Sequence, residues 1–322
     1  MSPEIDVHTP ISARPGSAGP GQGDLDCLVI GAGPAGLTTA VYLGRFHRKV
    51  LVADGGPSRA SLIPVSHNYP GFPPGISGSE LLARLREQAK RYGARIEDGR
   101  IESLIKNSTG FIAQINERSV TARRVVLATG IVDTLPHMER PYDAVAQAII
   151  RLCPICDGYE VNGDNVAVYG EAQCAIKHAL FLRSFTDRVT VLVNEDVHGC
   201  EDAIATARDA GIKIVRDRVK QIEVSNRQVQ VATCNGESLC FDVVYPSLGS
   251  HVCSDLAMQL GAEANEEGAL RVDSHQGTSV SGLYAVGDVV DSLKQISVAT
   301  GQAAVCATAV HNSLAMRLWN PE

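Results

Sequence analysis

The sequence lacks an apolar run long enough to cross a membrane, which takes roughly 18 to 20 consecutive residues. The longest candidate begins near Leu25, but Gly31, Gly33, Pro34 and Gly36 interrupt it. The sequence also lacks a basic start followed by an apolar segment, which argues against a secretory signal. We therefore expect a cytoplasmic protein that does not associate with membranes.

An excess of positive charge is also missing. Lys and Arg number 29 against 36 Asp and Glu, which gives a formal net charge of −7. Because nucleic-acid surfaces need a basic patch or stripe, we expect no nucleic-acid partner. What is present is ordinary for a globular protein: 322 residues, of which 44% are hydrophobic and 20% charged. This length favours about two domains.

The N-terminal part of the sequence predicts a flexible tail followed by a strand, a glycine turn, a helix and a second strand. Residues 1–23 are rich in Pro, Gly and Ser without apolar periodicity, and we expect them to form a flexible tail. The pattern then predicts a strand at 27–30, a helix at 35–46 and a strand at 50–53. This order is typical of a nucleotide-binding βαβ unit.

The same unit recurs later in the chain. A strand is predicted at 166–169, a helix at 172–184 and another strand at 189–193, again with a glycine turn after the first strand. A repeated βαβ unit predicts an α/β protein with two Rossmann-like dinucleotide-binding domains.

The first glycine loop has the spacing of a pyrophosphate-binding turn. Gly31 permits the tight turn, Gly33 lets the backbone approach the phosphates, and Gly36 allows close helix–strand packing. The free amides at the start of the helix would face the phosphates. Asp54 ends the second strand, where a carboxylate can accept the ribose hydroxyls.

Cys153 and Cys156 form the CxxC pair of the sequence, in an arrangement that suits a reversible disulfide. Asp157 follows directly and could donate or accept a proton. The alternatives are half of a zinc site, for which a second close pair is missing, or two inert buried thiols. The other seven cysteines are expected to be small core residues: Cys27, Cys174, Cys200, Cys234, Cys240, Cys253 and Cys306.

Several motifs in this order resemble the low-molecular-weight thioredoxin reductase family in its broad sense. The resemblance extends over roughly residues 25–315. It rests on the first glycine loop, Asn68-Tyr-Pro-Gly-Phe72 with Gly75-Ile-Ser-Gly78, Ala128-Thr-Gly130, Cys153-Pro-Ile-Cys156-Asp157, and Gly287-Asp288 with Gln295-Ile296.

The resemblance implies an FAD domain split in sequence around an inserted NAD(P)-binding-like domain. The FAD domain would comprise residues 24–136 and 251–322, and the inserted domain, which carries the CxxC pair, residues 137–250. A homodimer is implied as well. So is a rotation of one domain against the other during turnover, which this sequence alone does not show.

The resemblance also assigns roles to single residues. Cys156 would contact the flavin ring, Cys153 would attack the partner disulfide, and Asp157 would act as the acid. His67, beside Asn68, is expected to be a surface or packed histidine instead. The residues implied to bind FAD are Gly31, Gly33, Pro34, Ala35, Gly36, Asp54, Gly55, Ser58, Arg59, Asn68, Thr129, Gly130, Gly287, Asp288, Gln295 and Ile296.

The second glycine loop departs from the family pattern GxGxxA. It begins at Gly170, but Ala172 stands where the second glycine belongs, and Glu171 adds a negative charge. Asn194 and Glu195 stand where two arginines would hold a 2′-phosphate. A carboxylate there disfavours NADPH, and three alternatives stay open for the site of Gly170 and Glu195. NADH, or NADPH used poorly, could feed the flavin. Ferredoxin could do so beside a second domain that has lost its nucleotide, or a second flavin could occupy the second site.

The sequence therefore predicts an FAD-dependent dithiol–disulfide oxidoreductase that acts on thioredoxin or a small disulfide or dithiol, with no metal site. Two alternatives stay open. The first is a flavin-dependent dithiol oxidase that passes electrons to oxygen. The second is a flavin-binding regulatory protein that has lost its electron input.

Overall fold

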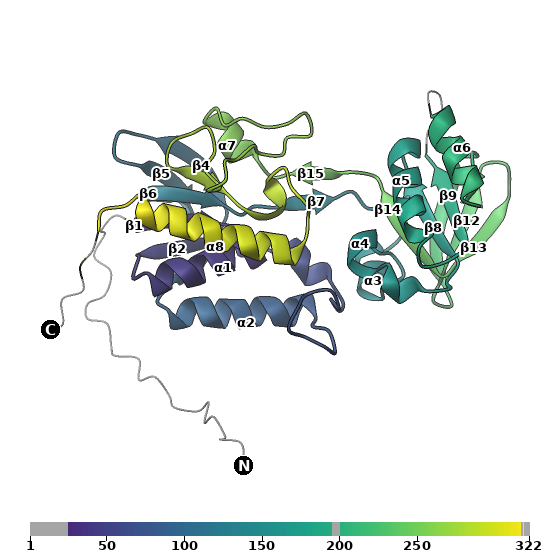
Figure 1. The fold of residues 1–322 in the computed structure, drawn as a ribbon, viewed down its shortest axis with the longest axis horizontal. Helices are drawn as coiled ribbons and strands as arrows, with labels where there is room; N and C mark the ends of the chain where they lie inside the picture. Colours follow the sequence, from purple (N-terminus) through teal and green to yellow (C-terminus); the bar gives the residue numbers. More distant parts are fainter. Residues whose placement is uncertain (1–24, 195–199, 317, 319–322) are drawn as a thin grey trace, which may run out of the picture.

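The computed structural model describes residues 25–194, 200–316 and 318. These residues form two bodies, joined by the paired antiparallel strands β7 (Ile131–Asp133) and β15 (Ser250–Val252) (Figure 1). The expected tail at residues 1–23 and the predicted site residue Glu195 lie outside the described residues. No helix in the described ranges has the length and apolar content that crossing a bilayer requires.

The larger body is built on one seven-stranded sheet. Its strands are β1 (Leu25–Ile30), β2 (Val50–Asp54), β3 (Arg95–Asp98), β4 (Ile101–Lys106), β5 (Phe111–Ile115), β6 (Arg118–Leu127) and β16 (Leu283–Ala285). The order is β3-β2-β1-β6-β5-β4, and β16 pairs in parallel with β6. A strand from the C-terminal part of the chain thus completes the sheet that the N-terminal part begins.

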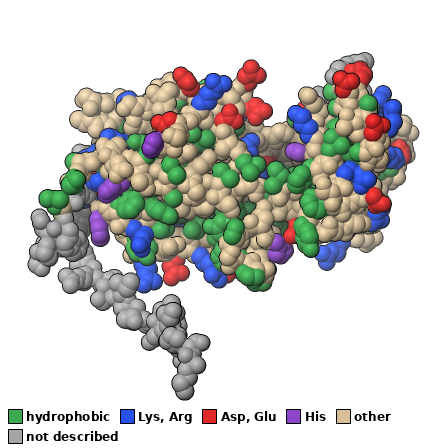
Figure 2. Space-filling model, viewed as in Figure 1, with side chains coloured by type: hydrophobic (Ala, Val, Ile, Leu, Met, Phe, Trp, Pro, Cys, Tyr) green, Lys and Arg blue, Asp and Glu red, His purple; other side chains and the backbone are tan. Residues whose placement is uncertain are grey.

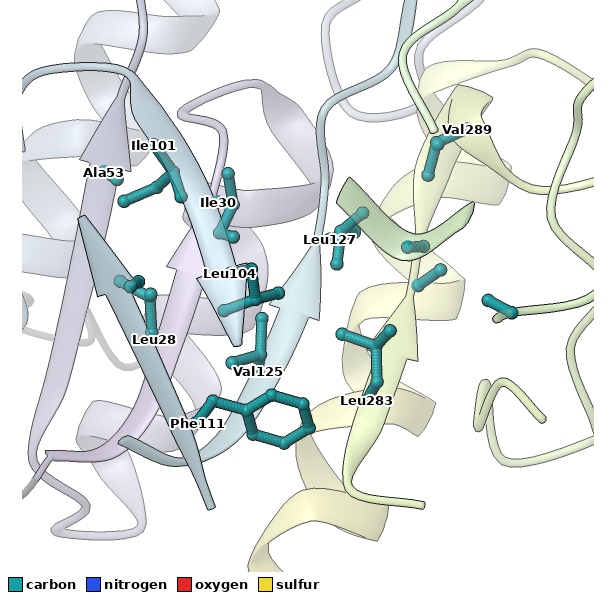
Figure 3. Close-up of a cluster of buried hydrophobic side chains, with 14 of the residues drawn as sticks. Leu28, Ile30, Ala53, Ile101, Leu104, Phe111, Val125, Leu127, Leu283 and Val289 are labelled. Atoms are coloured by element: carbon teal, nitrogen blue, oxygen red, sulfur yellow. The ribbon is translucent and has the colours of Figure 1, made fainter. Parts of the chain in front are cut away.

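The two faces of this sheet are covered differently (Figure 1). Three helices pack on one face: α1 (Pro34–Arg45), α2 (Gly78–Arg91) and α8 (Ile296–Asn312). Because side chains alternate along a strand, Cys27 and Val29 face these helices, while Leu28 and Ile30 join Phe111 in the core of the opposite face (Figure 3). Three shorter elements complete the larger body: η1 (Arg59–Leu62), α7 (Asp255–Gln259) and η3 (Gly287–Val289).

The smaller body has a four-stranded parallel sheet in the order β10-β9-β8-β14. These strands are β8 (Val166–Gly170), β9 (Val189–Val193), β10 (Lys213–Val215) and β14 (Val243–Ser247). One face packs against α5 (Ala172–Leu182) and α6 (Glu201–Asp209). The other face packs against α3 (Pro141–Ala146) and the antiparallel strands β11 (Val219–Ser225), β12 (Gln228–Thr233) and β13 (Ser238–Phe241). The short elements α4 (Pro154–Asp157) and η2 (Tyr159–Val161) precede β8.

The fold class predicted from the sequence is confirmed: two Rossmann-like βαβ units stand on parallel strands, the second within the first. Helix ends differ slightly from the prediction. The first helix begins at Pro34, because proline is well suited to the first helical position. The helix predicted at residues 172–184 ends at Leu182. The smaller body lies between β7 and β15, and the exact domain boundaries stay a prediction.

Candidate active site

A cavity of about 1000 Å³ lies where the two bodies meet, and both bodies line it. The surface of the molecule is hollowed at this junction (Figure 2). This volume is at the upper end of the range of about 300–1000 Å³ that ligand sites usually occupy. Most of the predicted FAD-binding residues line it: Gly31, Gly33, Pro34, Ala35, Gly55, Ser58, Arg59, Asn68, Thr129, Gly130, Gly287, Asp288, Gln295 and Ile296. Gly36, Asp54 and Gly170 are not among the lining residues.

The glycine loop after β1 forms a cradle that side chains would fill. Gly31 has a φ of +111°, and a Cβ there would lie 2.3 Å from the carbonyl oxygen of Ala128. A Cβ on Gly33 would reach to 3.1 Å from Ser58 Oγ. Gly33 also caps α1 without a side-chain hydrogen bond, so the first amides of the helix stay available to a ligand. These residues fit the pyrophosphate of a dinucleotide.

Asp54, at the end of β2, contacts an arginine side chain of the same chain. Its Oδ2 lies 2.5 Å from an Arg86 guanidinium nitrogen, and its Oδ1 accepts a hydrogen bond from the Gly56 amide at 3.2 Å. The predicted ribose contact of Asp54 remains a prediction, since Arg86 already occupies part of the carboxylate.

Arg59 and Asp288 lie together on one wall of the cavity. Arg59 donates from Nε and Nη2 to Asp133, at 2.6 and 3.0 Å, and its Nη1 lies 3.6 Å from Asp288. Burial raises the pKa of Asp288, and the positive charges of Arg59 and Lys294 oppose that rise. The structure thus brings these two predicted residues into one charged cluster.

Cys153 and Cys156 form a disulfide whose sulfurs face the start of α8. Gln295 donates from Nε2 to Cys156 Sγ at 3.3 Å and to Cys153 Sγ at 3.5 Å. The Gln295 Oε1 in turn accepts from Asn68 Nδ2 at 3.0 Å. Three segments far apart in sequence therefore meet at the disulfide, and each carries a residue that the resemblance implies to contact FAD.

Cys153 caps the short helix α4. Its sulfur accepts a hydrogen bond from the Cys156 amide at 3.2 Å. A donor of this kind stabilises negative charge on sulfur, so in the reduced pair it would favour the thiolate of Cys153. This geometry suits the nucleophile role predicted for Cys153, which stays a prediction.

Asp157 is held at both carboxylate oxygens. Tyr245 donates its hydroxyl to Oδ1 at 2.8 Å, and an Arg151 guanidinium nitrogen lies 3.1 Å from Oδ2. Burial raises the pKa of Asp157 above the usual value, although the charge of Arg151 and the hydrogen bond from Tyr245 oppose this rise. A carboxyl with a raised pKa, lining the cavity beside the disulfide, can hold a proton for transfer.

His67 and Glu160 were not assigned to the site from the sequence. The structure places His67 Nδ1 of the larger body 2.9 Å from Glu160 Oε1 of the smaller body, and both residues line the cavity. His67 was expected to be a surface or packed histidine, but the structure shows that it also forms a contact between the two bodies. The two positions are too far apart in sequence for spacing to pair them.

The second glycine loop is built differently from the first. Glu171 caps α5 and its carboxylate accepts from the Gln173 amide, the position that a phosphate would take. Ala172 is 2% exposed, with its methyl group in the core between α5 and the sheet. A hydrogen bond with Glu171 also raises the pKa of the Cys174 thiol to about 11. The start of α5 therefore differs from the uncapped, glycine-lined start of α1.

The remaining cysteines do not share one environment. Cys27 and Cys306 are buried, as expected. Cys174 and Cys234 are exposed, so the prediction that all seven are core residues is wrong: Cys174 lies on the outer side of α5 and Cys234 in a turn after β12. In the ranges that the structure covers, no group of three or more His, Cys, Asp or Glu is arranged to hold a metal ion.

Known proteins match this architecture over most of the chain. The family model described as pyridine nucleotide-disulphide oxidoreductase matches residues 25–303, and the chain belongs to this family. It is a thioredoxin reductase-like enzyme of that class. The thioredoxin reductase of Treponema pallidum is 31% identical over 89% of this chain and 96% of its own length. That of Mycolicibacterium smegmatis is 30% identical over 88% and 94%. The crystal structure of thioredoxin reductase from Streptococcus pyogenes, at 24% identity, covers 91% of this chain and 98% of its own, with a TM-score of 0.84.

Proposed function

We propose that this chain is an FAD-dependent dithiol–disulfide oxidoreductase that exchanges electron pairs with the Cys153–Cys156 disulfide. Its substrate would be thioredoxin or a small disulfide. The names of its relatives support thioredoxin as a substrate class. When bound, FAD would supply the two-electron chemistry that links the disulfide to an electron donor.

One observation carries the proposal. The disulfide lies on the wall of the cavity that the first glycine loop lines, and Gln295 joins it to Asn68. A dinucleotide held at Gly31 and Gly33 would therefore extend toward the sulfurs. An inert disulfide has no physical need for this position.

Residues around the disulfide would orient the sulfurs, favour the thiolate and supply a proton. Gln295 orients the two sulfurs, the Cys156 amide favours charge on Cys153, and Asp157 holds the proton that a leaving thiolate takes up. Half-burial of both cysteines limits access of water. Each of these roles is proposed from position and chemistry.

The electron donor is proposed not to be NADPH. The Glu171 carboxylate at the start of α5 would repel a phosphate, and Ala172 stands where a glycine would let the backbone approach one. Two like charges about 4 Å apart repel by roughly 4 kcal/mol at an effective dielectric of 20. Electrons would instead come from another donor, such as a ferredoxin, or from the dithiol side.

An anaerobic titration of the flavin tests the proposal. We expect dithiothreitol to bleach the visible band of oxidised flavin through Cys153 and Cys156, and the variant Cys153→Ser to lose this response. We expect NADPH to bleach it at least about tenfold more slowly, since a penalty of 1.4 kcal/mol already gives this factor.

The outcomes separate the parts of the proposal. Bleaching of Cys153→Ser at the wild-type rate would overturn the redox role of the pair. Rapid bleaching by NADPH would overturn only the statement about the donor. Hydrogen peroxide formation with dithiols in air, at rates that match turnover, would favour the dithiol oxidase instead of the reductase.

A further inference from the structure

Tyr245 carries a polar hydroxyl group on a ring that is buried among apolar side chains. It lies on β14, its residue exposure is 0%, and its ring packs among the aliphatic side chains between the sheet and α5. Its hydroxyl is 2.8 Å from Asp157 Oδ1 and 3.3 Å from the Asp157 carbonyl oxygen. Tyr245 does not line the cavity, whereas Asp157 does. The tyrosine therefore reaches Asp157 from the core side.

We propose that Tyr245 is a positioning residue that sets the orientation and acidity of Asp157 for proton transfer to a leaving thiolate. The inference rests on the proposed function and identifies the residue that adjusts the acidity of Asp157 in that reaction. Phenylalanine would fill the same volume without the hydroxyl, so packing alone does not account for a tyrosine here. A buried hydroxyl needs a partner, and here the partner is the proposed acid Asp157.

Tyr245 would assist a thiol–disulfide exchange between the reduced enzyme and its substrate. The Cys153 thiolate attacks one sulfur of the substrate disulfide and forms a mixed disulfide, while the substrate S–S bond breaks. The leaving sulfur keeps the bond pair and takes the proton from Asp157. The Cys156 thiolate then attacks Cys153, re-forms the Cys153–Cys156 bond and releases the second substrate thiolate, which takes a proton from water. Two electrons pass from the enzyme dithiol to the substrate.

The groups that face Asp157 define what Tyr245 adds. Arg151, from the segment before α4, contacts the other oxygen, and Glu160, from η2, is the nearby negative charge. Glu160 is itself paired with His67 of the larger body. Arg151 and Tyr245 both favour the ionised carboxylate, while burial and Glu160 favour the protonated form. Loss of the hydroxyl therefore moves the pKa of Asp157 upward.

The test compares Tyr245→Phe with Tyr169→Phe. Tyr169 lies on the neighbouring strand β8, and its ring packs on the opposite face of the same sheet. The control therefore also removes a tyrosine hydroxyl, but one that does not contact Asp157. The flavin of each holoenzyme is photoreduced without oxygen and mixed with hydroxyethyl disulfide between pH 5 and 9. Reoxidation of the flavin band is followed. A parallel series uses dithiobis(nitrobenzoate), whose aromatic thiolate leaves without a proton.

With hydroxyethyl disulfide, the rate falls at alkaline pH as Asp157 loses its proton. We expect the midpoint of this fall to lie about 1 pH unit higher in Tyr245→Phe, since the free energy of a hydrogen bond to a charged group corresponds to a pKa change of about that size. The maximal rate should fall about threefold to tenfold, because a weaker, less constrained acid donates more slowly. Tyr169→Phe should match the wild type. With the aromatic disulfide, all three should agree within about twofold, because no acid is needed.

An unmoved pH profile in Tyr245→Phe, with a strong loss in Asp157→Asn, would overturn the role of Tyr245 and leave that of Asp157 intact. An unchanged rate in Asp157→Asn would overturn both roles. Unchanged reoxidation in Cys153→Ser would instead overturn the proposed function. An equal loss in Tyr245→Phe with both disulfides would show a structural effect and also overturn the inference.

Discussion

At the scale of single residues, the glycines of the first loop differ in what a side chain would meet. A Cβ on Gly36 would lie 1.9 Å from the carbonyl oxygen of Gly31, a backbone atom that cannot rotate away. Gly301, in the middle of α8, has no heavy atom within 4 Å of the same position. One glycine is required by packing, and the other is not.

We predict that Gly36→Ala destabilises the protein by about 3 kcal/mol and lowers its flavin content, because overpacking forces α1 away from β1. Denaturant unfolding and the flavin-to-protein absorbance ratio measure both effects. Gly301→Ala serves as the control and should stabilise the protein by about 0.5–1 kcal/mol, as alanine does for glycine within a helix. A stable, flavin-replete Gly36→Ala protein would contradict the prediction.

At the scale of elements, the two βαβ units differ at the first turn of their helices. The start of α1 has no side-chain cap and faces the cavity, whereas the start of α5 is capped by its own Glu171. Each helix offers free amides and a positive dipole end. In α5 the protein itself supplies the negative charge that a nucleotide would bring.

We predict that the double variant Glu171→Ala with Ala172→Gly binds NADH at least about tenfold more tightly than the wild type, because the repelling carboxylate is removed and the turn regains the glycine that lets a backbone approach a phosphate. Titration calorimetry with NADH measures the change.

The control is Glu201→Ala with Ala203→Gly, which makes the same two changes in the first turn of α6. Equal affinities in all three proteins would mean that the barrier to nucleotide binding lies outside the α5 turn.

At the scale of the whole molecule, the two bodies touch at several points besides β7 and β15. His67 pairs with Glu160, Gln295 contacts the disulfide, and Leu62 of η1 packs against an apolar cluster of the smaller body. These contacts hold the disulfide at the cavity. Access of a protein disulfide to Cys153 would require them to open.

We predict that His67→Ala makes Cys153 of the reduced enzyme react about twofold to fivefold faster with a bulky maleimide. The contact between His67 and Glu160 is partly exposed, so its loss should favour separation of the two bodies by no more than about 1 kcal/mol. Timed alkylation followed by mass spectrometry measures the rate. His275→Ala, in an exposed turn of the larger body, is the control and should react like the wild type. A rate in His67→Ala equal to the control would show that the contact between His67 and Glu160 does not hold the bodies together.

The sequence by itself determined the class of the protein because its main signals are local. The glycine loop from Gly31 to Gly36, its repeat at Gly170 and the spacing of Cys153 and Cys156 each depend on residues within one turn. Strand and helix periods fixed the α/β class for the same reason. The weakened second loop could be read from Glu171 and Ala172 alone.

Only the tertiary structure decided which distant residues meet. Tyr245 and Asp157 are 88 positions apart, and Asn68 and Gln295 are 227 apart. The engagement of Asp54 by Arg86 and the pairing of His67 with Glu160 also depend on how separate segments pack. No local period encodes such contacts, because they arise where the two sheets and their connecting loops converge. The acidity of Asp157 and the position of the disulfide are therefore properties of the folded chain.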